Sequence, residues 1–339
     1  MDPMQSLDEI IEPVVDAGRD RLLEHEVLDL LDAVGLATPR RRFVAVTQLT
    51  GEDSWRDLPF AEGVLKVAAD GLVHKTEVGA IRFLSCAGDH VVADEAQQLV
   101  RGLPPETRRN VRGVLFEETA AVEAGLGREL LVGLRHAEAL GPVLHVGVGG
   151  IAVEPLARAL RPEANWVLRV PGITSEARWR SKLHRSLWFR SAAGLLRGTP
   201  PLCEPAELER EIRRWLTGIE RIAEAVRRRG RVVTELEINP LGWAGRWLAL
   251  DGMARLSSPR PTRPAACTTR MGRALNPTTV AIVGVSRTAE RSVGRIILTN
   301  LLEGGFPSAR LHLVHPSGQP IDDVPTVDSL SLIHISEPT

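Results

Sequence analysis

The chain has 339 residues, of which 43% are hydrophobic and 25% charged, and its formal net charge at pH 7 is -1. This composition is typical of a globular protein that buries a sizeable core over two or three domains. The even charge balance gives no signal for a polyanionic partner such as nucleic acid. The acidic N-terminus lacks a signal-peptide pattern, and no apolar run approaches the ~20 residues of a membrane span.

The cysteines are Cys86, Cys203 and Cys267, an odd number at wide spacing. Neither a disulfide framework nor a zinc site has this pattern. We therefore expect a reduced, cytoplasmic protein without a nucleic-acid or membrane partner.

The N-terminal part predicts a helix followed by a strand. Residues 1–20 mix acids with short apolar pieces, and residues 21–34 place leucine and valine at helical spacing. Gly35 ends this helix, and Phe43–Val46 is the first expected strand.

The stretch 64–79, VLKVAADGLVHKTEVG, sets basic residues around a strand and a turn. Lys66 lies inside an apolar strand that ends at Asp70-Gly71, and a lysine held this way is a positioned point charge. After the turn, His74 and Lys75 present an imidazole and a second cation, so His74 is a candidate nucleophile toward a phosphoryl group. The alternative is an edge lysine and a solvated loop histidine.

The middle of the chain alternates helix and strand patterns. A helix is expected over 93–103 and an apolar strand over 111–119, which ends in the carboxylates of Glu117 and Glu118. These two acids are either part of a binding site or a solvated strand end. Two glycine-bounded runs follow, GRELLVG at 127–133 and GPVLHVGVGGI at 141–151.

Two helices are expected next. Residues 178–190 are basic and carry Trp179, Trp188 and Phe189, and we interpret them as a solvated amphipathic helix rather than a binding patch. Residues 207–229 place apolar side chains on one stripe, and the helix is closed by Gly230.

The run TELEINPLGWAGRWLALDG, residues 234–252, predicts a hairpin with a polar face. Alternation puts Glu235, Glu237 and Asn239 on one face of a strand, and we expect Pro240 to stop that strand.

After a turn at 242–245, the alternation over 247–251 leaves Asp251 able to lie beside Asn239. A carboxylate and an amide oxygen, with phosphates supplying further oxygens, suit magnesium. The alternative is a hairpin with a solvated face.

Residues 256–277 are rich in Pro, Ser, Thr and Arg and predict a linker. A β-α-β pattern follows, with strands over 279–283 and 311–314 and a helix over 293–303, as at the start of a Rossmann-type unit. Its turn residues are Gly284, Ser286 and Gly294.

In order, these motifs resemble those of the NDP-forming acyl-CoA synthetases, also called ADP-forming acetate-CoA ligases. The 64–79 stretch resembles VLK...HKSDVG of the family's ATP-grasp domain, and the glycine-bounded runs resemble GRELIVG and FGPVVMFGLGGI. The 234–252 run resembles ELDINPL...AVDAR, which succinyl-CoA synthetase shares. Residues from 279 onward resemble the family's CoA-binding domain.

The resemblance implies a role for each matching residue. His74 takes up phosphate from the nucleotide, and Glu237 lies near the phosphohistidine. The implied nucleotide contacts are Lys66 and Lys75 at the phosphates, and Glu117 and Glu118 where the hinge meets the adenine. We interpret Gly149 and Gly150 as a backbone path that passes close to nucleotide phosphate or to a partner domain. Asn239 and Asp251 bind the metal, whereas Gly284, Ser286 and Gly294 belong to the CoA-binding unit.

The chain departs from the family's pattern at several positions. It inserts ARALRPE at 157–163, and if Arg169 is the matching arginine, Asn165 stands at an acidic position. His315 and Ser317 stand where relatives often have the Asn and Lys of an NPKG turn.

The expected fold class is α/β, an ATP-grasp fold followed by a partial Rossmann-like CoA-binding domain. The expected boundaries are an N-terminal extension at 1–19, the ATP-grasp domain at 20–256, a linker at 257–276, the partial CoA-binding domain at 277–329 and a non-native tail at 330–339. The tail LSLIHISEPT resembles the translation of a transposon-end sequencing adapter, so we expect a truncated gene product.

By this resemblance the complete enzyme interconverts acyl-CoA, ADP and phosphate with carboxylate, ATP and CoA, and uses Mg²⁺. Its partners are the small carboxylate or acyl-CoA substrate and the ligase domains missing from this chain, and the complete enzyme is expected to be an oligomer. Two alternatives remain. One is a non-catalytic nucleotide- or CoA-binding regulatory protein, such as a partner of a protein acetyltransferase, and the other is a succinyl-CoA synthetase β-like subunit.

Overall fold

The computed structural model describes residues 3–58, 60, 62–72, 75, 78–85, 89–150, 162–259, 277–288 and 292–329. The chain divides into two compact units, Met1–Pro259 and Arg260–Thr339. Within the described ranges, none of the helices has the length and apolar character needed to cross a membrane.

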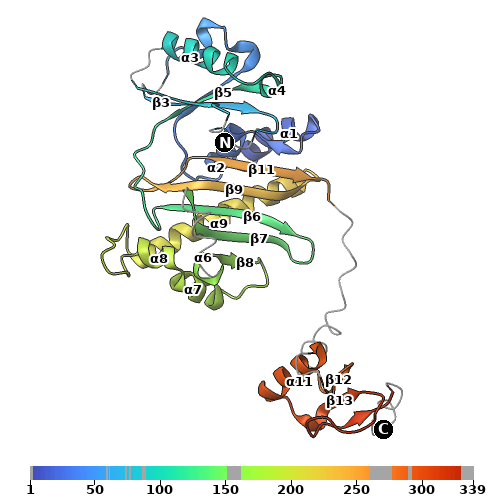
Figure 1. The fold of residues 1–339 in the computed structure, drawn as a ribbon. Helices are drawn as coiled ribbons and strands as arrows, with labels where there is room; N and C mark the ends of the chain where they lie inside the picture. The colour runs from blue at the N-terminus through green and yellow to red at the C-terminus, as the bar shows by residue number, and fades with distance from the viewer. Residues whose placement is uncertain are drawn as a thin grey trace. The chain divides into compact units, whose positions relative to one another are not determined.

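The first unit mixes helices with antiparallel strands (Figure 1). Its helices are α1 (Pro3–Asp16), α2 (Glu24–Ala33), α3 (Asp89–Arg101), α4 (Pro105–Arg108), α6 (Pro162–Asn165), α7 (Glu176–Arg185), α8 (Leu187–Ala192) and α9 (Pro205–Arg228), with the 3-10 turns η1 (Val46–Gln48) and η2 (Glu52–Trp55). Its strands are β1 (Arg21–Leu22), β2 (Arg41–Ala45), β3 (Gly63–Ala69), β4 (Ile81–Leu84), β5 (Val111–Glu118), β6 (Glu129–Ala137), β7 (Gly141–Val148), β8 (Val167–Arg169), β9 (Val232–Trp243), β10 (Trp247–Ala249) and β11 (Gly252–Ser257).

The smaller sheet of this unit has the order β2-β5-β3-β4, and every neighbouring pair is antiparallel. Helix α3 packs against β3 and β4, and its buried Val92, Ala96 and Leu99 share a core with Leu65 and Val67 of β3. All seven residues of β3 are buried, so Lys66 lies inside an apolar strand as the sequence predicts.

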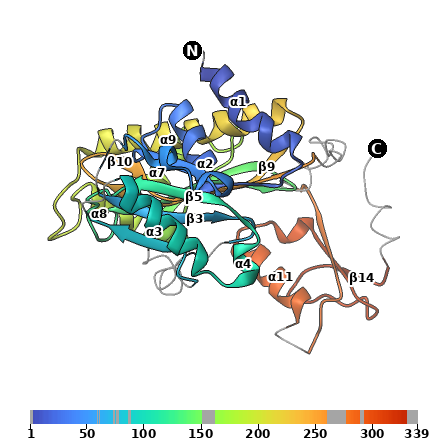
Figure 2. The same cartoon turned by 90° about the horizontal axis from the view of Figure 1, so that it is seen from above.

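The larger sheet has seven strands in the order β1-β11-β9-β6-β7-β8, with β10 paired to β9. Helix α9 packs on β6 and β9. Figure 2 shows α9 along one face of the sheet that contains β9. Its buried stripe includes Leu208, Ile212, Leu216, Ile219 and Ile222, which confirms the predicted amphipathic helix. The same core takes up Leu7, Ile11 and Val14 of α1.

The prediction of a solvated helix over the basic segment 178–190 is wrong. It forms two short helices, α7 and α8, because Ser186 has extended backbone angles and lies between them. The side chains of Trp179, Trp188 and Phe189 are fully buried in the large core, so burial of apolar area decides how this segment packs.

Strand β9 does not end at Pro240 as expected but continues to Trp243, and the Asn239–Pro240 peptide is cis. The strand continues because the groups after the proline keep partners: the Pro240 carbonyl accepts from the Leu250 amide at 3.1 Å, and the Trp243 amide donates to the Arg128 carbonyl at 2.9 Å. Leu236 and Ile238 are buried while Glu237 and Asn239 are part-exposed, so the predicted alternation is confirmed.

Helix α2 joins the two sheets. On its side, the imidazole of His25 stacks on the Phe43 ring of β2 at 3.6 Å between centroids. The guanidinium of Arg41 on β2 pairs with Asp29 and Asp32 of α2. Helix α2 also packs on β11, so its first turn lies between the small and the large sheet.

The second unit contains β12 (Val280–Val283), α11 (Val293–Glu303), the 3-10 turn η4 (Ser308–Arg310), β13 (Leu311–Val314) and β14 (Thr326–Val327). Its three strands are parallel in the order β12-β13-β14, which confirms the β-α-β expectation. Gly284 ends β12 at φ +82°, a conformation that favours glycine. A side chain at Gly294 would lie 2.9 Å from the Gly284 carbonyl oxygen, so glycine lets α11 approach the strand closely.

The buried stripe of α9 gives a stability prediction. Ile219→Ala should lower the free energy of unfolding by ~2–5 kcal/mol, because it removes a fully buried side chain and leaves a cavity. Arg221→Ala, on the exposed face of the same helix, should change it by less than ~0.5 kcal/mol. Urea unfolding followed by tryptophan fluorescence reports this unit alone, since all seven tryptophans precede residue 260. Equal losses for both variants would contradict the packing of α9.

Candidate active site

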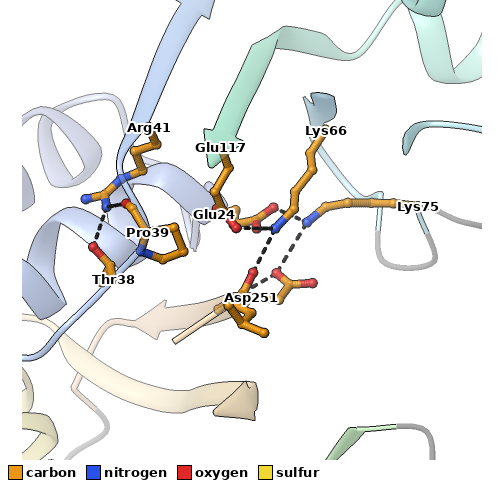
Figure 3. Close-up of polar contacts among 10 residues, drawn as sticks. Glu24, Thr38, Pro39, Arg41, Lys66, Lys75, Glu117 and Asp251 are labelled. Atoms are coloured by element: carbon orange, nitrogen blue, oxygen red, sulfur yellow. Dashed lines mark hydrogen bonds and ion pairs between the residues drawn. The ribbon is translucent and has the colours of Figure 1, made fainter. Parts of the chain in front are cut away.

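Lys66 lies on β3 with its ammonium surrounded by oxygen atoms (Figure 3). Its Nζ donates to Glu24 Oε1 at 2.7 Å, to Glu117 Oε1 at 3.0 Å and to the Leu250 carbonyl at 2.7 Å. Glu117 belongs to the neighbouring strand β5, whereas Glu24 and Leu250 come from the part of the unit built on the large sheet. Lys66 therefore connects the two sheets.

Lys75 reaches the same place from the segment that follows β3. Its Nζ pairs with the second oxygen of the Glu24 carboxylate and lies 3.3 Å from Asp251 Oδ1. Glu24 thus holds one lysine on each of its two oxygens. Figure 3 shows both lysine side chains converging on this carboxylate. The sequence predicts the two cations as phosphate contacts, and the structure brings them together.

The two carboxylates that share Lys66 differ in proton affinity. Burial acts to raise the pKa of Glu24, but the charges of Lys66 and Lys75 outweigh it and the pKa is lowered. Burial raises the pKa of Glu117 to about 7. The charge of Lys66 acts to lower this pKa, but the charge of the nearby Glu24 opposes that effect. Lys66 itself keeps its proton, since the two carboxylates more than offset its burial. The ion pair with Glu24 is therefore the stronger of the two.

A cavity of about 320 Å³ opens beside this cluster. Its lining includes Glu24 and Lys75 on one side and Glu237, Asn239 and Asp251 on the other. The backbone amide of Asn239 donates to the Asp251 carbonyl at 3.2 Å. This contact confirms the prediction that the two residues lie side by side. Burial, and then the charge of Glu235, raises the pKa of Glu237.

The side chains of Asn239 and Asp251 suit a magnesium ion. Both offer oxygen atoms to the same cavity, and Asp251 also binds the amide of Gly252 through Oδ1 at 2.8 Å. Across the described ranges no cluster of three or more His, Cys, Asp and Glu forms a closed cage. Magnesium fits such a donor set, because it is usually bound through one or two carboxylates together with phosphate oxygens and water.

Gly149 and Gly150 follow β7 at the edge of this site. A side chain at Gly149 would lie 2.1 Å from the carbonyl carbon of Leu130, so only glycine fits. Gly150 has φ +65°, and its amide donates to Asn239 Oδ1 at 2.9 Å. The hydrogen bond from Gly150 fixes the side-chain oxygen of Asn239. That the backbone of these glycines passes close to nucleotide phosphate or to a partner domain stays a prediction.

A second recess, of about 590 Å³, extends the same polar face of the large sheet. It shares Glu237 and Asn239 with the first cavity and adds His145 and Trp166. Glycines make room for these two rings: a side chain at Gly133 would lie 2.8 Å from His145 Nε2, and one at Gly147 would lie 2.6 Å from the Trp166 ring. The face is thus open along β6, β7 and β9.

The other predicted nucleotide contacts are placed as follows. Glu118 pairs with Arg40 at the surface and points away from Glu117, as alternation on β5 requires. His74, the predicted nucleophile, lies outside the described residues. The departure at Asn165 has a structural explanation: its Oδ1 accepts from the buried amide of Val148 at 2.9 Å, and its carbonyl accepts from Trp188 at 2.8 Å.

Glu24 is the site residue that sequence reasoning missed. It lies in the first turn of a helix, where an acid is usually explained by the helix dipole. Its partner Lys66 is 42 residues away, so no local spacing announces the contact. The only available signal is that a lysine inside an apolar strand requires a buried counter-charge.

In the second unit, Gly284 and Gly294 form the close turn between β12 and α11 described above, and the Ser286 hydroxyl accepts from the Thr288 amide at 3.3 Å. His315 and Ser317 bond to each other, with His315 Nδ1 2.8 Å from Ser317 Oγ. These contacts define the turn structure of the unit, and a role in binding CoA stays a prediction.

Comparison with known proteins gives a family and several relatives. The ATP-grasp domain model matches residues 13–256. An ADP-forming 4-hydroxybutyrate-CoA ligase of Nitrosopumilus maritimus is 28% identical over 43% of this chain and 20% of its own length. An ADP-forming acetate-CoA ligase of Archaeoglobus fulgidus is 31% identical over 45% of this chain and 21% of its own length. The chain therefore matches about a fifth of each of these relatives.

Solved structures share the fold. A protein from Pyrococcus horikoshii has a TM-score of 0.57 at 19% identity, over 76% of this chain and 100% of the other. An acetyl-coenzyme A synthetase of Ca. Korarchaeum cryptofilum, solved with coenzyme A and a nucleotide analogue, has a TM-score of 0.55 at 23% identity, over 74% of this chain and 100% of the other. A second structure of that enzyme contains a phosphorylated phosphohistidine segment and has a TM-score of 0.55 at 21% identity, over 74% of this chain and 100% of the other.

The domain match over 13–256 fits the structure, which has two sheets and a pair of lysines where the sheets meet. The chain belongs to the ATP-grasp family, and its relatives in sequence are ADP-forming acyl-CoA ligases.

Proposed function

We propose that this chain is the nucleotide-binding and phosphate-handling part of an ADP-forming acyl-CoA synthetase. The observation that carries the proposal is a cavity lined by Lys75, Asn239, Asp251 and Glu237, beside which Glu24 holds Lys66 next to Lys75. Two cations facing an oxygen-rich wall suit the phosphates of ATP with a magnesium ion.

Each side chain then has a task. Lys66 and Lys75 bind phosphate oxygens. Their positive charge offsets the negative charge of the phosphates, which the attacking nucleophile must approach. Asn239 and Asp251 are the residues that would hold magnesium, which when bound neutralises phosphate charge. The Gly150 amide keeps the Asn239 oxygen oriented toward the cavity. Glu237 lines the same cavity, and its proposed task is to contact the phosphorylated imidazole.

The reaction proposed for the complete enzyme proceeds in two phosphoryl transfers and one acyl transfer. A histidine nitrogen, His74 in this chain, attacks the γ-phosphorus of ATP, the bond to the β-γ bridging oxygen breaks, and ADP leaves. The phosphoryl group then passes to a carboxylate oxygen, and CoA sulfur displaces phosphate from the acyl phosphate to give acyl-CoA. The reverse direction forms ATP from ADP and phosphate.

The partners follow from this proposal. The second unit supplies the start of a CoA-binding fold through Gly284, Ser286 and Gly294, and the acyl-transfer step is assigned to ligase domains beyond this chain. The small-molecule ligands are ATP or ADP, a carboxylate and CoA. The complete enzyme is proposed to be a cytoplasmic oligomer, without a membrane or nucleic-acid partner.

The first prediction concerns the metal. Asp251→Asn should weaken Mg²⁺-ATP binding by ~10–100-fold, because it removes a charged metal ligand, and should weaken binding of metal-free ATP much less. Lys66→Met should weaken both by a similar factor, since a lysine acts on phosphate directly. Isothermal titration calorimetry with and without EDTA measures both ratios.

The matched control for these variants is Asp53→Asn, whose side chain is 80% exposed in a surface ion pair. It should leave both affinities unchanged. If Asp251→Asn weakened the two forms of ATP equally, the metal assignment would be wrong and Asp251 would serve only to hold Lys75.

The second prediction concerns His74. Incubation with γ-labelled ATP and magnesium should give an acid-labile label, because a phosphoramidate forms on the imidazole. His74→Ala should abolish the label while it leaves ATP affinity within about threefold, since affinity rests on the lysines. Peptide mapping at neutral to alkaline pH locates the label. A variant that labels as well as the wild type would remove His74 from the mechanism, and no label in either protein would favour a regulatory, nucleotide-binding role.

A further inference from the structure

Glu24 makes the contacts on which both lysines depend. Its side chain is 5% exposed, one carboxylate oxygen binds Lys66, and the other binds Lys75. The lysines come from β3 and from the segment after it, whereas Glu24 comes from α2, which packs on the large sheet. One side chain therefore fixes two cations from the opposite side of the cleft.

Among the residues that the structure describes, Glu117 and Asp251 are the other acids of the cluster, and neither binds both lysines. Glu117 reaches Lys66 alone, and its Oε2 has no hydrogen-bond partner among the described residues. Asp251 reaches Lys75 at 3.3 Å and also binds the Gly252 amide. A buried ammonium that loses its counter-charge is strongly destabilised, so the positions of both lysines require the Glu24 carboxylate.

We propose that Glu24 is a positioning residue that holds Lys66 and Lys75 as a matched pair for the phosphates of the nucleotide. The inference rests on the proposed function for the identity of the ligand. Glu24 lines the cavity beside Lys75, and among the described residues Lys75 donates to Glu24 and Asp251, which leaves its third ammonium proton for phosphate. Lys66 donates its three protons to Glu24, Glu117 and the Leu250 carbonyl, so it binds phosphate by exchanging one of these bonds. It acts through the lysines and needs no contact with the nucleotide.

A competing account makes the opposite prediction. If Glu24 only occupied the lysines until phosphate displaced it, its removal would free them and strengthen ATP binding. If it positions them, its removal lets both side chains leave the cleft and weakens ATP binding. The sign of the change separates the two accounts.

The first measurement is nucleotide affinity by calorimetry. Glu24→Gln should weaken ATP binding by about 10-fold or more, since a neutral amide cannot accept from both lysines. Glu24→Asp keeps the charge and both oxygens and should recover part of the loss. Glu224→Gln, which removes a surface carboxylate of α9, should have no effect. In a chain that carries Lys66→Met and Lys75→Met, adding Glu24→Gln should change affinity by less than about twofold, because the effect acts through these lysines.

The second measurement does not involve ATP. Acetylation by acetic anhydride at one fixed pH, mapped by mass spectrometry, reports how firmly each amine is held. Lys66 and Lys75 should react slowly relative to exposed Lys182 of α7, and Glu24→Gln should accelerate both by at least fivefold. Glu24→Asp should accelerate them less.

Unchanged acetylation rates, tighter ATP binding by Glu24→Gln, or an undiminished effect in the double lysine variant would each overturn the inference. Failure of the wild type to bind ATP would overturn the proposed function instead. The acetylation rates would still decide whether Glu24 holds the two lysines.

Discussion

The buried ion cluster of Glu24, Lys66 and Lys75 is the interaction on which the arrangement of this site depends. A lysine inside a buried strand is costly unless its charge is matched. The smaller sheet supplies Glu117 as a partner, but the more strongly ionised partner, Glu24, comes from the other side of the cleft. The need to satisfy Lys66 therefore links the two sheets at the place where we propose that phosphate binds.

The large sheet completes the site through its register. Strand β9 presents Glu237 and Asn239 on its polar face while Leu236 and Ile238 enter the core beneath α9. The continuation of β9 past Pro240 lets the return of the chain through β10 bring Asp251 back beside Asn239. Glycines at 133 and 147 make room on the same face for the rings of His145 and Trp166, which line the second recess.

Much of the fold was predictable because periodicity is a local property. The stripe of α9, the alternation of β9 and the β-α-β order of the second unit all follow from apolar spacing, and each is present. The burial of the aromatic residues of α7 and α8 does not follow from the local sequence, because the many basic residues around them favour a solvated helix. The strand that passes through Pro240 was missed for a related reason: a proline rule is local, and the partners of the following groups are distant in sequence.

The site divides in the same way. Lys75, Asn239 and Asp251 stand in recognisable motifs, and the structure brings them to one cavity, with Lys66 held beside it by Glu24. Glu24 has no motif of its own, because its role exists only once α2 is placed against β3. The contact of the Gly150 amide with Asn239 Oδ1 is likewise visible only in three dimensions.

The most direct test of the account is a crystal structure of this chain with magnesium and a non-hydrolysable ATP analogue. We predict phosphate oxygens within hydrogen-bonding distance of the Nζ atoms of Lys66 and Lys75, a metal ion bound by Asn239 and Asp251, and Glu24 still in contact with both lysines. A nucleotide bound in the cleft without contact to either lysine, or bound only elsewhere on the chain, would contradict the account.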